Sequence, residues 1–192
     1  MSSSLPCSLL RQFLFCPRIP YYVEVLGIRP HQPLWVRQGV DWHKRQELLS
    51  RNRTLARYGL LSARKVFQCH LESETMGIHG IADLVLLTDK EVIPVEFKQG
   101  AGPLNKGGHV QLTAYGMLAE EHFGRTFQRS FVLSGEKAQA ESFPDTPERR
   151  QTLQHTIAGL RTVLDSPLLP DSSASHPKCG QCEYLAHCND RF

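Results

Sequence analysis

The middle of the chain carries short apolar runs that are typical of β-strands. Residues of about 62–73, 78–88 and 91–98 are rich in Val, Ile, Leu and Phe, and polar or glycine-containing turns separate them. A fourth run, about 127–133, has the same character. Apolar runs of this length that are bounded by turn residues predict strands that pair as neighbours in a sheet.

Elsewhere the apolar positions recur at helical spacing. Residues of about 34–57 are predicted to form one helix, and a second helix follows the glycine-rich loop 100–108. A third helix is predicted over about 147–164, where one apolar face repeats every three or four residues. This order of elements predicts an α/β fold of the mixed α+β type, with a central mixed sheet flanked by helices.

Composition changes this picture little. The chain has 192 residues, of which 41% are hydrophobic and 21% charged, which is ordinary for one globular domain over 1–192. A Pro- and Ser-rich stretch, 167–177, leads into the C-terminal segment. No run approaches the length of a membrane helix, and the first residues do not form a signal peptide, so we expect a cytoplasmic protein with no membrane partner.

Two carboxylates and a lysine fall where a divalent metal ion and a phosphodiester can meet. Side chains alternate along a strand, so Glu96 and Lys98 are expected on one face, and Asp83 on the face of Ile81 and Val85. If these strands are neighbours, Asp83 and Glu96 converge, and one or two carboxylates with water and phosphate suffice for Mg²⁺ or Mn²⁺. A charged outer face is the ordinary alternative. Carboxylates among apolar residues, however, are costly unless they are paired or bind metal.

Three further polar residues fit the same site. His43 follows Val36 and Val40 at helical spacing, so its imidazole is expected on the buried stripe of the helix. A hydrogen-bonded core histidine is the alternative. Gln111 and Tyr115 are i, i+4 partners on the helix after the glycine-rich loop, where they can jointly contact DNA or the lysine. Helices contain such pairs routinely, so this spacing alone is weak support.

The cysteines indicate a second metal site. Three of the six fall within ten residues near the C-terminal end: Cys179, Cys182 and Cys188. Clustered cysteines in a cytosolic chain indicate metal binding rather than disulfides. Cys16 is the expected fourth ligand, with Cys7 as its competitor, and Cys69 is expected to be a buried, inert thiol. Four thiolates suit zinc or a [4Fe–4S] cluster, and spacing does not separate the two.

The net charge of +3 is too small to indicate nucleic-acid binding, but its distribution is uneven. Residues 44–65 carry seven basic side chains against Glu47 alone. Candidate phosphate contacts in this stretch are Arg51, Arg53 and Arg57. A solvated helix face is the alternative. Lys106, in the glycine-rich loop, is placed to reach a DNA strand entering the site.

Taken together, these residues resemble the motif series of the RecB-like branch of the PD-(D/E)xK nucleases. The motifs, in order, are Gly39-x-x-x-His43, Gly80-x-Ala82-Asp83, Glu96-x-Lys98 and Gln111-x-x-x-Tyr115. Ala82, in place of Pro, is the departure from the family name. By resemblance, Mg²⁺ or Mn²⁺ would be held by His43, Asp83, Glu96 and the Phe97 backbone carbonyl. The catalytic group would be Asp83, Glu96, Lys98, Gln111 and Tyr115.

The cysteines extend this resemblance to the iron–sulfur nucleases, which include helicase-nucleases of recombination and the small CRISPR-associated nuclease of the spacer-acquisition module. By resemblance, a [4Fe–4S] cluster, with zinc as the alternative, would join segments 1–30 and 167–192. Its ligands would be Cys16, Cys179, Cys182 and Cys188. The chain has no room for a helicase motor and no phosphate-binding loop, which favours the stand-alone CRISPR-associated form.

The resemblance implies a metal-dependent nuclease that processes prespacer DNA with single-stranded or 3′-overhanging ends. Its implied partner is the CRISPR adaptation integrase complex in a prokaryotic cytoplasm, and selection of a protospacer-adjacent motif is a further implied role. Three alternatives stay open: a repair or recombination single-strand exonuclease, a non-catalytic DNA-reading scaffold, and a zinc-stapled binding protein. The intact His43, Asp83, Glu96 and Lys98 argue against a vestigial site.

Overall fold

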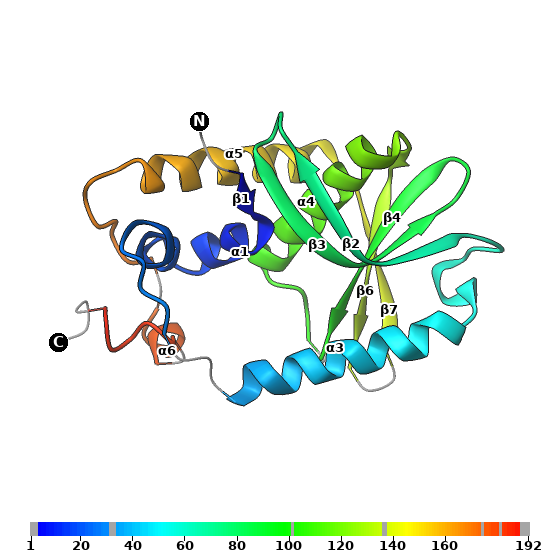
Figure 1. The fold of residues 1–192 in the computed structure, drawn as a ribbon, viewed down its shortest axis with the longest axis horizontal. Helices are drawn as coiled ribbons and strands as arrows, with labels where there is room; N and C mark the ends of the chain where they lie inside the picture. Colours follow the sequence, from blue (N-terminus) through cyan, green and yellow to red (C-terminus); the bar gives the residue numbers. More distant parts are fainter. Residues whose placement is uncertain are drawn as a thin grey trace.

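The sheet is built on an antiparallel meander of three strands. The computed structural model describes residues 4–30, 34–100, 102–135, 138–173, 175–180 and 182–188, and for 34–40 it describes the backbone alone. In it β2 (Arg64–Ser73), β3 (Ile78–Leu87) and β4 (Glu91–Lys98) pair in turn as antiparallel neighbours (Figure 1). Short turns connect these strands, and strands joined by short turns pair antiparallel.

A crossover through α4 (Lys106–Phe123) makes the rest of the sheet mixed. β6 (Arg129–Ser134) lies parallel to β4, and β7 (Gln139–Pro144) pairs antiparallel with β6. Parallel neighbours need a long connection, and α4 provides it. Two short strands extend the sheet in parallel: β1 (Leu5–Pro6) beside β3, and β5 (Thr126–Phe127) beside β4.

Helices cover both faces of the sheet. α1 (Cys7–Phe15), α4 and α5 (Pro147–Leu164) pack together on one side, and α3 (Leu34–Asn52) runs across the other side, followed by the short 3-10 helix η2 (Leu55–Tyr58) (Figure 1). Away from the strands lie three short helical turns: α2 (Arg18–Pro20), the π-helical η1 (Tyr21–Val25) and α6 (His176–Cys179). No helix in the described ranges has both the length and the apolar character needed to cross a membrane.

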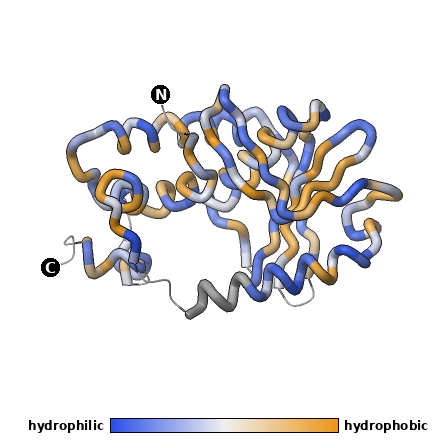
Figure 2. Tube along the Cα trace, viewed as in Figure 1, coloured by the Kyte–Doolittle hydropathy of each residue, from blue (hydrophilic) through white to orange (hydrophobic). Residues whose placement is uncertain are grey.

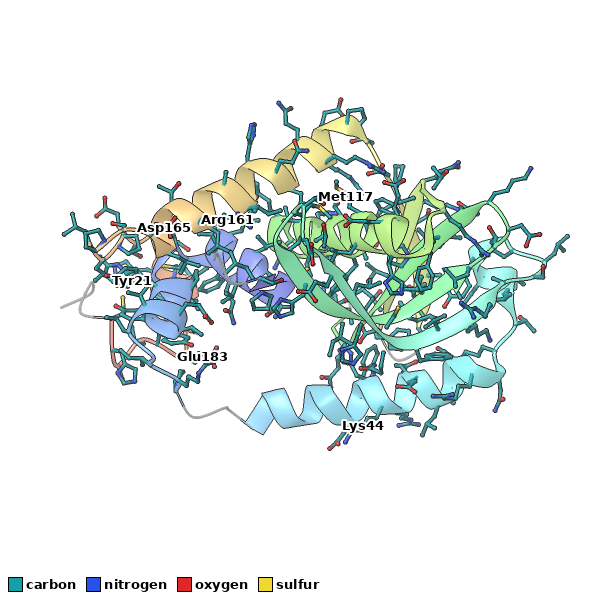
Figure 3. All side chains as sticks on the ribbon, turned by 45° about the horizontal axis from the view of Figure 1, so that its top comes forward. Tyr21, Lys44, Met117, Arg161, Asp165 and Glu183 are labelled. Carbon is teal, nitrogen blue, oxygen red and sulfur yellow. The ribbon has the colours of Figure 1, made fainter. Side chains whose placement is uncertain are left out.

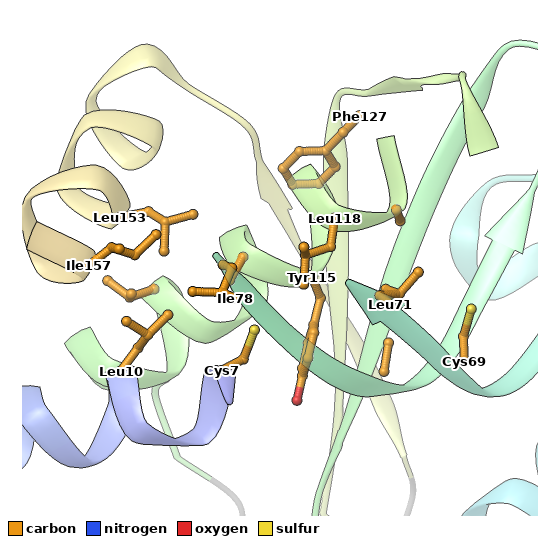
Figure 4. Close-up of a cluster of buried hydrophobic side chains, with 14 of the residues drawn as sticks. Cys7, Leu10, Cys69, Leu71, Ile78, Tyr115, Leu118, Phe127, Leu153 and Ile157 are labelled. Atoms are coloured by element: carbon orange, nitrogen blue, oxygen red, sulfur yellow. The ribbon is translucent and has the colours of Figure 1, made fainter. Parts of the chain in front are cut away.

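Two apolar layers hold these elements together. Hydrophobic stretches of the trace are prominent in the central strands of the sheet (Figure 2). The first core layer joins β3 to the three packed helices, with Leu10 of α1, Leu118 of α4 and Leu153 of α5 fully buried (Figure 4). The second core layer lies on the opposite face, beneath α3 and η2, and includes Phe97 and Tyr58. A strand buried on both faces is expected to be mostly apolar, as β3 is over residues 84–87 and β4 over residues 92–95.

The turn between β2 and β3 is tied to α5. Arg161 of α5 (Figure 3) donates hydrogen bonds to the carbonyl oxygens of Met76, at 3.1 Å, and Gly77, at 3.3 Å. Gly77 has φ +60°, and a Cβ atom at this position would collide with the guanidinium group. Only glycine both adopts a positive φ without strain and leaves space for the Arg161 guanidinium group.

The predicted fold class is confirmed, with corrections at element ends. The strands expected at 78–88 and 91–98 and the helix at 147–164 match β3, β4 and α5 closely. The single helix expected over 34–57 is wrong, because α3 ends at Asn52. The Lys65 ammonium group caps this end by donating to the carbonyl oxygens of Ser50, Arg51 and Arg53. The strand expected at 127–133 is divided between β5 and β6.

The expected face of Asp83 is also corrected. Strict alternation would place Ala82 and Leu84 in one layer, yet Ala82 packs in the first core layer and Leu84 in the second. Consistently, Ile81 is 45% exposed whereas Val85 is fully buried, so the two do not share a face. The alternation of β3 therefore reverses at Asp83.

Candidate active site and cysteine pocket

Asp83 is held from two sides at the point where β3 and β4 separate. The backbone pairs between these strands end at Leu84 with Val95. Beyond this pair the Phe97 N–H donates to Asp83 Oδ2 at 2.8 Å instead of to a backbone carbonyl of β3. The other carboxylate oxygen, Oδ1, lies 3.1 Å from Nδ1 of His43 on α3. One carboxylate thus connects β3 to both β4 and α3.

Glu96 forms an acidic pair with Asp83. The β3–β4 register, continued by one residue, places Glu96 opposite Asp83. Burial, together with the negative charge of Asp83, raises the pKa of Glu96 to about 8. The hydrogen bond to Asp83 raises the pKa of His43, although burial acts in the opposite direction. The negative charge of the site favours the protonated forms of Glu96 and His43, and a divalent cation can replace these protons.

These groups line one open cavity of about 770 Å³, which we call the catalytic pocket. The residues expected from the sequence that lie on its wall are His43, Asp83, Glu96, Phe97, Lys98 and Gln111. Its wall also includes polar groups that the sequence analysis did not single out, among them Arg11, Lys44 and Gln68. Val36 and Val40, expected to share the face of His43, lie outside the described side chains.

Lys98 and the Gln111–Tyr115 pair have partners of their own. Lys98 Nζ donates to the carbonyl oxygens of Gly102, at 3.0 Å, and Pro103, at 3.1 Å. Gln111 Nε2 donates to Tyr115 Oη at 2.9 Å. The amide and the phenol are therefore joined to each other on α4, and the lysine is held by the loop that precedes α4.

Gly80 of the second motif makes room for this arrangement. A Cβ atom at Gly80 would lie 2.7 Å from Tyr115 Cε1 and 3.3 Å from Cys7 Sγ. Cys7, the competitor for the fourth cluster ligand, is thus part of the first core layer beside the candidate active site. Burial raises the pKa of its thiol to about 12.

The candidate DNA-binding residues divide into two groups. The three arginines contact the protein itself: Arg51 with Glu47 at 2.6 Å, Arg53 with Gln46 at 3.0 Å, and Arg57 with the Ala138 carbonyl at 3.2 Å. They do not line the catalytic pocket. Lys106 lies on an adjoining cavity of about 830 Å³, which shares Arg11 and Asn105 with the catalytic pocket. Phosphate contact stays a prediction for all four residues.

The cysteine pocket is a small cavity, of about 20 Å³, formed by the end of α1 with the turns after it and by residues that follow α5. Its cysteines are Cys16, Cys179, Cys182 and Cys188. Burial, together with the charges of the other three sulfurs, raises the pKa of the Cys182 thiol. Tyr22 and Tyr184 stack beside the pocket at 5.7 Å between ring centroids, and Arg18 Nη1 lies 3.4 Å from Cys188 Sγ. Residues from 16–22 and 179–188 therefore form one cluster.

Neither pocket is a closed metal cage. Across the described parts of the chain, no three His, Cys, Asp or Glu side chains are gathered closely enough to hold a metal ion among themselves. The catalytic pocket instead offers carboxylates for coordination shared with water and phosphate. The cysteine pocket brings four sulfurs to one cavity. Cys69 is buried in the first core layer, as expected.

Arg11 reaches the catalytic pocket because α1 packs closely on α4. Gly107, in the first turn of α4, is the contact point: a Cβ atom there would lie 2.8 Å from Arg11 Cγ and 3.1 Å from the Arg11 carbonyl oxygen. The glycine pair at 107–108 was the available signal for a close approach. Nothing in the local sequence specifies that α1 is the element that approaches.

Comparison with known proteins identifies the family of the chain. The model of the PD-(D/E)XK nuclease superfamily matches residues 32–189. A CRISPR-associated exonuclease Cas4 from Francisella tularensis subsp. novicida (strain U112) is 42% identical over 188 residues, covering 98% of this chain and 95% of that protein. A CRISPR-associated exonuclease Cas4/endonuclease Cas1 fusion from Geobacter sulfurreducens is 30% identical over 199 residues, covering 96% of this chain and 33% of the fusion.

A solved structure supports the fold. The crystal structure of SSO0001 superimposes with a TM-score of 0.58, covering 100% of this chain and 88% of that chain, at 14% sequence identity. At this identity the likeness concerns the fold alone.

Proposed function

The chain belongs to the CRISPR-associated exonucleases of the PD-(D/E)XK nuclease superfamily, and from this premise we propose that its catalytic pocket cuts DNA with the help of a divalent metal ion. The observation that carries the proposal is the meeting of Asp83, Glu96 and His43 where β3 and β4 separate. Carboxylates and an imidazole at one open pocket are suited to hard and borderline divalent ions.

The donors of the pocket fit such an ion, and nucleases of this superfamily generally use divalent metals. Two carboxylates that oppose each other in a half-buried site repel, and the raised pKa of Glu96 reflects this cost. A bound cation would remove this repulsion. We assign Mg²⁺ or Mn²⁺ to Asp83, Glu96, His43 and the Phe97 backbone carbonyl. When bound, the ion would polarise the scissile phosphate and lower the pKa of a bound water molecule.

The remaining chemistry belongs to side chains of this chain. The proposed catalytic group is Asp83, Glu96, Lys98, Gln111 and Tyr115. Two loop carbonyl oxygens hold the Lys98 ammonium group at the pocket wall, so its charge is in position before substrate arrives. A fixed positive charge stabilises negative charge that develops on a phosphate. The Gln111–Tyr115 hydrogen bond keeps the α4 side of the pocket in one arrangement.

The cysteine pocket is the proposed site of a [4Fe–4S] cluster, with zinc as the alternative. Four sulfurs around one small, mostly apolar cavity support this ligand set. Because Cys16 directly follows α1 and the other three cysteines follow α5, a cluster here would join the terminal segments 1–30 and 167–192. Its proposed role is structural.

The proposed substrate is prespacer DNA with a single-stranded or 3′-overhanging end, and the proposed setting is CRISPR adaptation in the cytoplasm. The cavity beside the catalytic pocket carries Lys106, Lys178 and Arg11, and cations of this kind position phosphates. Arg51, Arg53 and Arg57 are proposed to add weaker contacts. A relative that is named as a fusion to the endonuclease Cas1 supports association with the adaptation integrase, with motif selection as a shared task.

The proposal is tested by cleavage of DNA that carries a 3′ overhang, in Mg²⁺ or Mn²⁺. Asp83→Ala and Glu96→Ala should each lower the rate by about 100-fold or more, and Lys98→Ala should do so while leaving metal binding intact. Asp89→Ala, which removes an exposed carboxylate from the β3–β4 turn, is the matched control. Parental rates for the first two variants, with contaminating nucleases excluded, would overturn the assignment.

A further inference from the structure

Gln68 has an unusual backbone conformation for its place in the fold. It is one of two described non-glycine residues with positive φ, and both have φ 47°. The other, Ala138, lies in the connection between β6 and β7, where its N–H donates to the Gly135 carbonyl oxygen at 3.1 Å and such a conformation is common. Gln68 instead lies in the middle of the ten-residue strand β2. A left-handed residue with a side chain is disfavoured, because its Cβ approaches the following carbonyl oxygen.

This conformation coincides with the placement of Asp83. The β2–β3 pairs run to Phe67 with Leu84 and resume at Cys69 with Ala82, so the interruption has Gln68 opposite Asp83. Alternation reverses on β2 as well, because Phe67 packs against the second core layer whereas Cys69 lies in the first. Both strands therefore change faces at one rung of the sheet. At this position the Asp83 side chain contacts His43 and the Phe97 N–H.

The backbone alone does not explain a glutamine at this position. Glycine adopts positive φ without strain and would give the same reversal. The Gln68 side chain is exposed and lines the catalytic pocket together with Asp83, Glu96 and Lys98. Within the described part of the chain its carboxamide has no hydrogen-bond partner. Strained residues of this kind occur where the surrounding structure holds a side chain in a functional place.

We propose that Gln68 is a substrate-positioning residue, whose carboxamide N–H donates to a phosphate oxygen of the bound DNA strand. The inference rests on the proposed function, because it requires DNA in the catalytic pocket. A carboxamide supplies two N–H donors without charge. Beside the carboxylates of Asp83 and Glu96, such a donor attracts a phosphate oxygen without adding a positive charge that would pair with the carboxylates.

The test uses variants that separate the backbone from the side chain. Gln68→Gly should fold with an unchanged or higher melting temperature, yet bind and cut overhanging DNA roughly tenfold less well, mainly through KM, since one hydrogen bond to a charged oxygen is lost. Gln68→Asn keeps an amide and tolerates positive φ, so it should recover part of the loss. Ala138→Gly relieves the same φ away from the pocket and should leave cleavage unchanged.

DNA binding is also measured without cleavage, by fluorescence anisotropy in Ca²⁺. If Gln68→Gly binds and cuts like the parent, the proposal is wrong and the nuclease assignment stands. If the parent binds DNA but does not cut it, weaker binding by Gln68→Gly still supports the positioning role, while the proposed reaction fails. The proposal is overturned if the parent binds no DNA. It is also overturned if Gln68→Ala, which lacks the amide, binds DNA as well as Gln68→Asn does.

Discussion

Both oxygens of the Asp83 carboxylate are engaged before any ligand binds. One accepts the Phe97 N–H, and the other lies beside His43. A metal ion at this site must therefore share Asp83 with the backbone of β4 and replace the proton between Asp83 and His43. Glu96 holds a second proton, because burial and the neighbouring charge raise its pKa to about 8.

Metal binding should accordingly release protons and become tighter with increasing pH. Below the raised pKa values of His43 and Glu96 these proposed ligands are protonated, and a metal ion must displace the protons. Near pH 8 the competition is weaker. Titration calorimetry with Mn²⁺ in buffers of different ionisation enthalpy measures the number of protons released. His43→Gln should reduce that number, and an affinity that does not change with pH would contradict this account.

At the scale of whole elements, a charged network fixes α5 against α4 and the sheet. Arg150 of α5 lies 2.7 Å from Glu120 of α4 and 2.7 Å from Asp145. Glu120 also accepts the Phe127 N–H at 2.9 Å. Burial alone would raise the pKa of Glu120, but the bonds from Arg150 and Phe127 outweigh it and hold this pKa below its ordinary value.

Replacing Glu120 by Gln should destabilise the protein by about 1–2 kcal/mol at neutral pH, a range reduced for its partial exposure. Because the folded pKa is lowered, the ionised group stabilises the fold above its ordinary value of 4.5, and this contribution is lost as pH falls through the folded pKa. Urea unfolding at neutral and acidic pH measures the difference. Glu74→Gln, in an exposed turn, is the control, and an equal loss at both pH values would be the contrary result.

The sequence predicts the strands that are covered on both faces and misses a strand at the edge of the sheet. β3 and β4 are apolar because both faces are covered, so their existence follows from the pattern. β7 has a single buried residue, Phe143, and an edge strand of this kind carries little apolar signal. The proximity of Asp83 and Glu96 follows from strand pairing, but the face of Asp83 does not. Its reversal coincides with the positive φ angle of Gln68 on the neighbouring strand, which no hydrophobic pattern records.

At the scale of the whole molecule, the turns that follow α1 meet the segment that follows α5 at the cysteine pocket. Arg18 donates from Nε to the Pro170 carbonyl at 2.8 Å, and the Tyr21 hydroxyl donates to the Pro167 carbonyl at 3.1 Å. These bonds fasten the N-terminal turns to the segment after α5. α1, which carries Arg11, leads directly from the catalytic pocket to Cys16.

The purified protein is expected to be brown and to contain iron and sulfide. Cys16→Ser and Cys188→Ser should lose the colour and lower the melting temperature, because the proposed cluster joins both ends of the chain. Cys69→Ala removes a buried thiol from the first core layer and should keep the colour. Visible absorption and metal analysis of anaerobic preparations decide the matter. A colourless protein with zinc in place of iron would contradict the iron–sulfur assignment.

The cysteines of the cysteine pocket come from two distant parts of the sequence and are therefore synthesised at different times. Its first sulfur, Cys16, leaves the ribosome about 170 residues before the last, Cys188, which at ordinary rates of translation is on the order of ten seconds or more. During that interval β2, β3, β4 and α4 are already available to form the first core layer around α1. The nascent chain can thus assemble its nuclease core before the last cysteine of the proposed cluster site is translated.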